Sequence, residues 1–196
     1  LNPIESHSSL ALSDGNLEFD KTGTSGYGFY KSTIGVSSGK WYAEFTMGGE
    51  KQNVGITLAS HQVTNSSYAE SGTNSGVVYY SHNGYVYGHG NAAAYGSSFA
   101  NGDIIGIALD LDNSKIYFSK NGVFQNSGDP AAGTNAAQTG LSGTYVFAGH
   151  SNNTSNTTMS GKWNFGQRAF AYTAPSGFKA LCTTNLPTPT IADGST

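Results

Sequence analysis

Cysteine, arginine and long apolar runs are almost missing from this sequence, and each absence excludes a class of protein. Cys182 is the only cysteine, so the 196-residue chain can form neither an internal disulfide nor a cysteine-based zinc site. Arg168 is the only arginine and the formal charge is −3, so no basic stripe can neutralise a nucleic-acid backbone. No apolar run approaches the roughly 20 residues that a membrane helix needs. We therefore expect no nucleic-acid partner and no membrane insertion.

The chain also lacks helical periodicity, and its apolar pattern is that of strands. No window places apolar residues at i, i+3, i+4 and i+7, whereas 27 glycines and 12 tyrosines suit short strands joined by turns. In "KWYAEFTM" every second residue is apolar, which is typical of a sheet buried on one face. Strands are predicted at residues 16–20, 40–47, 53–59, 76–81, 84–89, 144–150 and 161–166, and in both halves of 101–122. Long polar loops are predicted at residues 60–75, 90–102, 125–143 and 151–160.

Many short strands with Gly- and Asn-rich turns predict an all-β fold, a two-sheet antiparallel sandwich or jelly roll. The length suits one domain, which we place at residues 1–186. Residues 187–196 are punctuated by Pro and Gly, and we expect them to be a linker or tail towards a following module. The alternation places the following side chains in the core: Trp41, Phe45, Ile56, Ile107, Leu109, Phe118 and Trp163.

The stretch "NGDIIGIALDLDNSKIYFSKNG", residues 101–122, raises the question of a catalytic or metal site because it holds Asp103, Asp110 and Asp112. Its alternation and its "DNS" and "NG" turns indicate an antiparallel hairpin. Calcium needs six to eight oxygen ligands, and the stretch lacks the Gly-centred loop and distal Glu of a dedicated site. A retaining glycosidase needs two carboxyl groups about 5 to 5.5 Å apart beside a cleft, and no matching strand motif occurs. We expect structural carboxylates, with no catalytic residues, metal or cofactor.

Aromatic residues in polar loops are the positive sign of a binding function. Tyr68, Tyr95 and Phe99 lie in or beside such loops, and Tyr among Ser, Gly and Asn is the composition of adaptable recognition surfaces. Such rings can also cap the ends of a sandwich core. The sequence leaves both readings open for each ring.

Five segments in a fixed order resemble the SPRY domain family. They are "GKWYAEFTM", "NVGITLAS", the hairpin of residues 101–122, "YVFAGHS" and "KWNFG", and together they cover roughly residues 38–166. The resemblance implies a concanavalin-like bent β-sandwich that binds proteins or peptides through loops at one end. It also implies that the domain has no catalytic residues and that the hairpin is structural.

The same resemblance implies a set of ligand-binding residues: Tyr68, Phe147, Ala148, Gly149, His150, Lys21 and Tyr27. Two departures from the family pattern affect the ligand. Ala148 stands where peptide-binding members carry a bulky aromatic residue, and their N-terminal-loop arginine has no counterpart in residues 20–28, "DKTGTSGYG". We therefore expect the surface to be retained with a different ligand.

The first and last segments of the chain resemble the ends of SPRY-like modules in large structural proteins of tailed, especially marine, phages. They are "LNPIESHSSLALSDGNLEF" and "FGQRAFAYTAPSGFKALCTTNLPTPTIADGS". The resemblance implies a non-catalytic recognition module on the surface of a virion, in a tail fibre or related adhesin. Its expected partners are a host-surface protein or glycan and other virion subunits, within a homotrimeric parent protein. A structural spacer is the second hypothesis, and a glycan-cleaving enzyme is the third.

Overall fold

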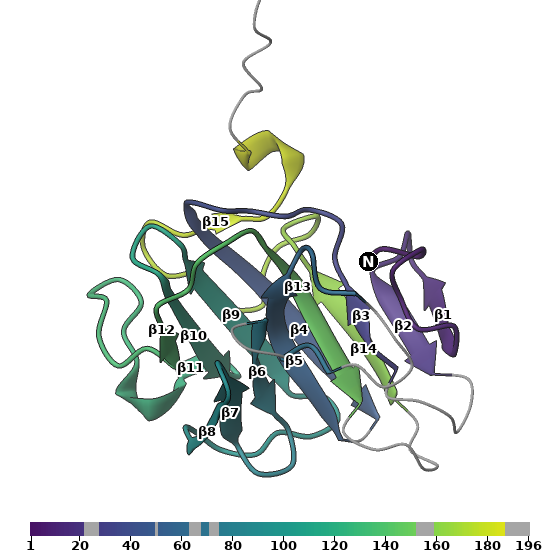
Figure 1. The fold of residues 1–196 in the computed structure, drawn as a ribbon, viewed down its shortest axis with the longest axis horizontal. Coiled ribbons are helices and arrows are strands. Elements are labelled where there is room, and N and C mark those ends of the chain that lie inside the picture. Colours follow the sequence, from purple (N-terminus) through teal and green to yellow (C-terminus); the bar gives the residue numbers. More distant parts are fainter. Residues whose placement is uncertain (22–27, 50, 63–67, 71–74, 152–158, 187–196) are drawn as a thin grey trace, which may run out of the picture.

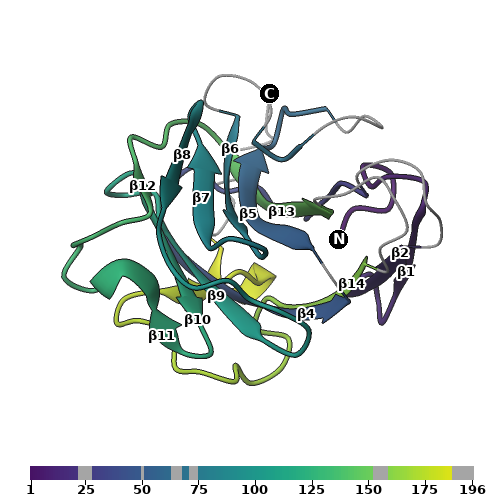
Figure 2. The same cartoon turned by 90° about the horizontal axis from the view of Figure 1, so that it is seen from below.

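Two antiparallel sheets pack face to face in the computed structural model, which describes residues 1–21, 28–49, 51–62, 68–70, 75–151 and 159–186 (Figures 1 and 2). Sheet A has the order β1 (Leu10–Ser13), β2 (Glu18–Lys21), β14 (Met159–Asn164), β4 (Lys40–Gly49), β9 (Ile104–Asp110), β10 (Lys115–Lys120) and β11 (Val123–Phe124). Beside these strands, β12 (Gln138–Thr139) pairs with β10, and β15 (Lys179–Ala180) pairs with β4 in parallel. Sheet B has the order β3 (Tyr30–Lys31), β13 (Tyr145–Ser151), β5 (Gln52–Leu58), β6 (Gly76–Tyr80), β7 (Tyr85–Gly88) and β8 (Asn91–Ala94). The predicted all-β, two-sheet antiparallel sandwich is confirmed.

Helices contribute little to the part of the chain that is described. They are the short 3₁₀ turns η1 (Gln125–Ser127) and η2 (Thr183–Asn185). Within the described ranges, no helix combines the length and the apolar character that crossing a membrane requires.

Six of the described strands were not predicted by the alternation of apolar residues: β1, β3, β8, β11, β12 and β15. β1 pairs with β2 at the edge of sheet A, while β8 and β12 lie within the predicted loops 90–102 and 125–143. All four residues of β8 are exposed because the strand forms the outer edge of sheet B. A strand that is exposed on both faces has no alternation to detect, so the loop prediction at residues 91–94 was wrong.

The core lies between the two sheets and is rich in aromatic rings. All seven predicted core residues are buried and belong to one apolar cluster. Trp163 of β14 is at its centre, with ring centroids 5.2 Å from Phe45 of sheet A and 5.7 Å from Phe147 of sheet B. The register of β14 against β4 places Trp163 opposite Phe45. For β4, β5, β9, β10 and β14, the alternation of apolar residues was therefore sufficient to predict which side of the strand faces inward.

Two of the three loop aromatics belong to this core. Tyr95 and Phe99 are 8% and 4% exposed, and their ring centroids lie 5.9 and 5.1 Å from that of Tyr79. For these two rings the core-capping alternative is correct. Tyr68 remains as the loop aromatic with a role outside the main core.

The acidic hairpin is tied together by its own polar groups. The Asp110 side chain is fully buried, accepts hydrogen bonds from the backbone and side chain of Asn113 at 3.0 and 2.9 Å, and pairs with Lys40 at 3.0 Å. Asp112 accepts the Gly39 N–H at 2.7 Å. Asp110 therefore holds the β9–β10 turn together and links it to β4. Asp112 links the same turn to Gly39, the residue before β4.

Removal of metal ions is expected to leave the stability of the domain unchanged. Asp103, the third carboxylate of the hairpin, pairs with Lys120 at 3.1 Å and accepts a hydrogen bond from Asn121 at 2.7 Å, so it too has protein partners. No group of three or more His, Cys, Asp or Glu side chains in the described ranges is placed to hold a metal ion. A chelator titration followed by thermal melting tests this, and a fall in Tm of several degrees would establish a metal site.

A buried carboxylate fixes the C-terminal segment against the outer face of sheet A. Glu44 of β4 is 3% exposed, and its oxygens accept the backbone N–H groups of Ala171 and Tyr172 at 2.8 and 2.9 Å. The ring of Phe170 packs edge-on against Tyr42, with centroids 4.9 Å apart. The segment that follows β14 therefore packs on part of the outer face of sheet A. The two hydrogen bonds to Glu44 hold it there.

Replacing Glu44 by Ala is expected to lower the free energy of unfolding by about 1 to 2 kcal/mol, because two N–H groups lose their acceptor. Urea unfolding of Glu44→Ala beside Glu44→Gln provides the measurement. The Gln side chain keeps one acceptor oxygen and should lose less than half as much. Equal stability of Glu44→Ala and the wild type would show that the anchor contributes nothing.

Candidate recognition surface

Residues 59–62 and 68–70, called here the covering segment, lie over the outer face of sheet B, which points away from sheet A. Two side chains of the sheet hold the backbone of Ala69 in this segment. The Thr57 hydroxyl donates to the Ala69 carbonyl oxygen at 2.6 Å, and the Ala69 N–H donates to Nδ1 of His150 at 3.3 Å. Because Ala69 is held on both sides, its neighbours Tyr68 and Glu70 have defined positions over the sheet.

A buried lysine holds the start of the covering segment. Lys31 of β3 is 1% exposed, and its ammonium group donates to the carbonyl oxygens of Ala59 and His61, both at 2.9 Å. It also pairs with Glu5 at 2.8 Å. The charge of Lys31 is therefore satisfied by polar groups from two separate parts of the chain, and the covering segment is fixed at both of its described ends.

Aromatic rings form a continuous row across this face, called here the aromatic row. Its members are Tyr68, His150, Tyr80, Tyr87 and Tyr85, with successive ring centroids 5.0, 5.9, 4.0 and 6.4 Å apart. His150 and Tyr80 are buried in the middle, whereas Tyr68 and Tyr87 are partly exposed and Tyr85 is 38% exposed. The row therefore presents ring surface to solvent at both of its ends.

The imidazole of His150 is the buried support under Tyr68. Tyr68 meets it edge-on, at an interplanar angle of 72°. Its Nδ1 accepts the Ala69 N–H at 3.3 Å, and its Nε2 lies 3.0 Å from the side-chain amide nitrogen of Asn53. Burial lowers the pKa of His150 to about 3, and burial also raises the pKa of Glu70, whose carboxyl lies 3.7 Å from Nδ1. The support of Tyr68 is therefore uncharged at neutral pH.

Acidification below pH 6.5 is expected to destabilise the domain through His150. The unfolded chain binds a proton near the ordinary pKa of 6.5 and the folded protein does not, so stability falls as the pH falls. Between pH 6.5 and 5.5 this contribution is about 1 kcal/mol. Glu70 acts in the opposite direction, because its raised pKa lets the folded protein keep a proton that the unfolded chain has already lost.

Urea unfolding of Glu70→Gln and of the double variant Glu70→Gln, His150→Asn at both pH values isolates the histidine. The single variant should lose about 1 kcal/mol more on acidification than the double variant. Equal losses would show that His150 is protonated in the folded protein.

The structure places the residues of the sequence-predicted site in different environments. Tyr68 lies on the outer face of sheet B, against His150, as part of the aromatic row. Ala148 and His150 point to the same outer face but are buried beneath the covering segment, whereas Phe147 belongs to the core between the sheets. Gly149 is buried in β13. None of the four residues 147–150 in β13 has an exposed side chain.

The remaining two predicted residues come from the N-terminal part of the chain. Lys21 is the last residue of β2 in sheet A and is 8% exposed. Tyr27 lies outside the described residues.

Sequence reasoning missed Tyr80, Tyr85 and Tyr87 as part of a surface. The predicted strands 76–81 and 84–89 contain them, and Tyr85 and Tyr87 alternate with the buried Val86. Two tyrosines on the solvent side of a strand were the available signal. Their proximity to Tyr68 depends on the pairing of β6 with β7 and of β5 with β13. Only the structure gives this pairing.

Comparison with known proteins gives the family of this fold. The SPRY domain family model matches residues 40–166, which is close to the range of the sequence resemblance. The chain belongs to the SPRY domain family. SPRY domains are in general protein–protein interaction modules.

The SPRY domain of human HERC1 shares the fold. A TM-score of 0.68 relates the two structures at 21% sequence identity, over 86% of this chain and 99% of the human domain. A curated relative, the dual specificity protein kinase splA of Dictyostelium discoideum, is 33% identical over 129 residues, which is 64% of this chain. The chain spans only 5% of the length of that kinase.

Proposed function

We propose that this SPRY domain is a non-catalytic recognition module that holds its ligand at the Tyr68 end of the aromatic row. The observation that carries the proposal is the mounting of Tyr68. Its ring rests edge-on against the buried His150, and the backbone of the next residue is held by Thr57 and His150. A partly exposed ring that is already ordered loses little conformational entropy when a ligand binds it.

The chemistry of the surface suits a ligand with both apolar and hydrogen-bonding groups. Tyrosine rings offer a flat apolar face and a hydroxyl group at the edge. Glu70 is the acidic residue of the covering segment beside the row, and its carboxyl accepts a hydrogen bond from the Tyr80 hydroxyl. The carboxylates of the hairpin are held by their own partners, which supports a binding role without catalysis. A protein segment is the first ligand class to test, because SPRY domains are in general protein–protein interaction modules.

The proposed setting is the surface of a phage virion, in a tail fibre or related adhesin that binds a host-surface protein or glycan. The first and last segments of the chain, which resemble phage module ends, support this setting. So do the low charge, 11% Asp, Glu, Lys and Arg, and the 27 glycines and 12 tyrosines. Other virion subunits, including two further copies in a homotrimer, are the proposed neighbours.

A binding survey with the labelled domain tests the proposal. The probes are a peptide display library, a glycan array and intact bacterial cells, each applied to the wild type and to Tyr68→Ala. Binding that the wild type shows and Tyr68→Ala loses supports recognition through this surface. Absence of binding to every probe, also by a trimeric form, would favour the structural spacer. Release of reducing sugar from a bound polysaccharide would instead favour a glycan-cleaving enzyme.

A further inference from the structure

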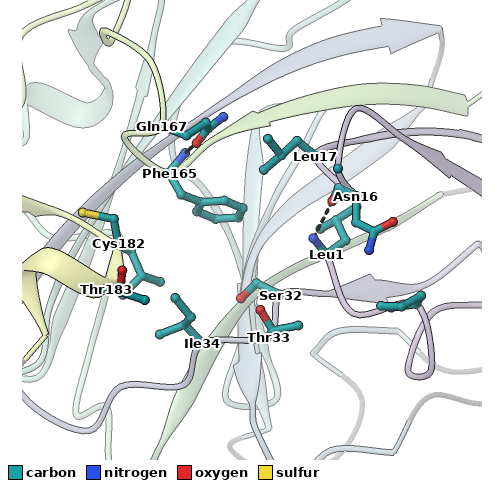
Figure 3. A pocket seen from close by; sticks show the side chains of 13 residues that line it. Leu1, Asn16, Leu17, Ser32, Thr33, Ile34, Phe165, Gln167, Cys182 and Thr183 are labelled. Carbon is teal, nitrogen blue, oxygen red and sulfur yellow. Dashed lines mark hydrogen bonds between the residues drawn. The ribbon is translucent and has the colours of Figure 1, made fainter. Parts of the chain in front are cut away.

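A pocket of about 450 Å³ opens between the edges of the two sheets, near the N-terminus (Figure 3). Its walls come from the β1–β2 turn, the residues after β3, the end of β14 and the residues after β15. None of the residues that line it belongs to the aromatic row or to the covering segment. It is therefore a separate site from the proposed recognition surface.

Apolar side chains form most of the pocket wall. Figure 3 shows the Phe165 ring facing the same space as Ile34 and Leu17. The Phe165 ring is stacked on Trp163 of the core, with centroids 5.1 Å apart and planes 5° from parallel. Leu181, 3% exposed, belongs to both the wall and the main core cluster. At the bottom of the pocket, side chains of the sandwich core are therefore accessible, and Phe165 is held there by its packing against Trp163.

The Ser32 hydroxyl group is a buried polar group of the pocket that can still donate a hydrogen bond. Ser32 is 5% exposed, and its hydroxyl oxygen accepts the Phe147 N–H at 3.1 Å. Within the described ranges the hydroxyl hydrogen has no acceptor, so it can be donated to a group in the pocket. Gln167, by contrast, already accepts the Phe165 N–H at 2.7 Å and donates to the Trp163 carbonyl oxygen at 2.9 Å.

The lining residues are uncharged in their side chains. They include no Asp, Glu, Lys, Arg or His, and the N-terminal ammonium group of Leu1 donates to the Asn16 carbonyl oxygen. A cationic ligand would lose hydration in this pocket without gaining an opposite charge, and the cationic group beside it, the Leu1 ammonium, already has the Asn16 carbonyl oxygen as a partner. The volume lies in the range of roughly 300 to 1,000 Å³ that is usual for small-molecule sites.

We infer that this pocket binds a small, uncharged and largely apolar molecule that carries one hydrogen-bond acceptor for the Ser32 hydroxyl. Phe165, Ile34 and Leu17 would contact its apolar part. Cys182 also lines the pocket, with its sulfur directed away from the space that these three side chains face (Figure 3). The ligand class follows from the wall chemistry and not from the proposed recognition function.

The neutral dye Nile red, which carries a ring carbonyl, is the probe for the test. We expect saturable fluorescence enhancement with one site per chain. Ile34→Asp places a charge in the wall and should weaken binding by about tenfold or more. Val123→Asp is the matched control, because Val123 is 67% exposed on β11 and does not line the pocket. Thr183→Trp, which fills the pocket from its exposed rim, serves as a second blocking variant.

The absence of saturable dye binding would overturn the inference. Equal affinity of the wild type and both pocket variants would overturn it as well. Tighter binding of the anionic dye anilinonaphthalene sulfonate than of Nile red would also overturn it, since it would show that the pocket prefers a charged ligand.

Discussion

Trp163→Ala is expected to lower the free energy of unfolding by about 3 to 5 kcal/mol, the range for deleting a buried aromatic side chain. The side chain is fully buried, and its ring touches rings from both sheets. Phe45 lies on one side, Phe147 and Tyr30 lie on the other, and Phe165 stacks on it at 5.1 Å. Because two hydrogen-bonded sheets frame the site, the surroundings cannot collapse far into the cavity that the substitution leaves.

Urea unfolding, with the slope of the transition checked for two-state behaviour, measures this loss. Trp163→Phe is the matched control, since it keeps a ring in contact with Phe45 and should cost clearly less than Trp163→Ala. A loss below about 1 kcal/mol for Trp163→Ala would mean that the tryptophan does not organise the core.

Most of the fold could be predicted from the alternation of apolar residues. Trp41, Ile107 and Phe118 are buried because each lies on the apolar side of a strand that is half-covered by the other sheet. β8 could not be predicted, because its sequence "NAAA" lies at a sheet edge where neither face is covered. Alternation of apolar residues marks a strand with one buried face, so it cannot predict a strand that is exposed on both faces.

The candidate surface could be predicted only in part. The family resemblance placed Tyr68 and His150 in one site, and the structure brings their rings to 5.0 Å. Tyr80 and Tyr87 join them through the pairing of two strands, with ring centroids 4.0 Å apart. Contacts between rings from different strands depend on the register of the sheet, which one sequence does not reveal. The composition of the loops was compatible with either a surface or a core position for Tyr95 and Phe99. In the structure both rings lie in the core.

Tyr68→Ala is expected to weaken ligand binding by about 2 kcal/mol or more, roughly thirtyfold, while the fold is kept. The tyrosine is partly exposed and lies outside the main core cluster, so its removal opens no cavity between the sheets. It is also held in place before the ligand arrives, through the His150 ring and the hydrogen bonds of Ala69. Both properties are those of a binding hot spot. Tyr68→Phe keeps the ring and loses only the hydroxyl, so it should lose less affinity.

The dissociation constant of Tyr68→Ala for the first peptide or glycan that the wild type binds is the most direct test of recognition at this surface. Titration calorimetry measures it beside the wild type and Val123→Ala, a control residue that is 67% exposed on sheet A. Unchanged melting temperatures establish that all three proteins are folded. We expect Tyr68→Ala to bind about thirtyfold more weakly and Val123→Ala to bind like the wild type. Wild-type affinity in a folded Tyr68→Ala protein would contradict the assignment of the recognition surface.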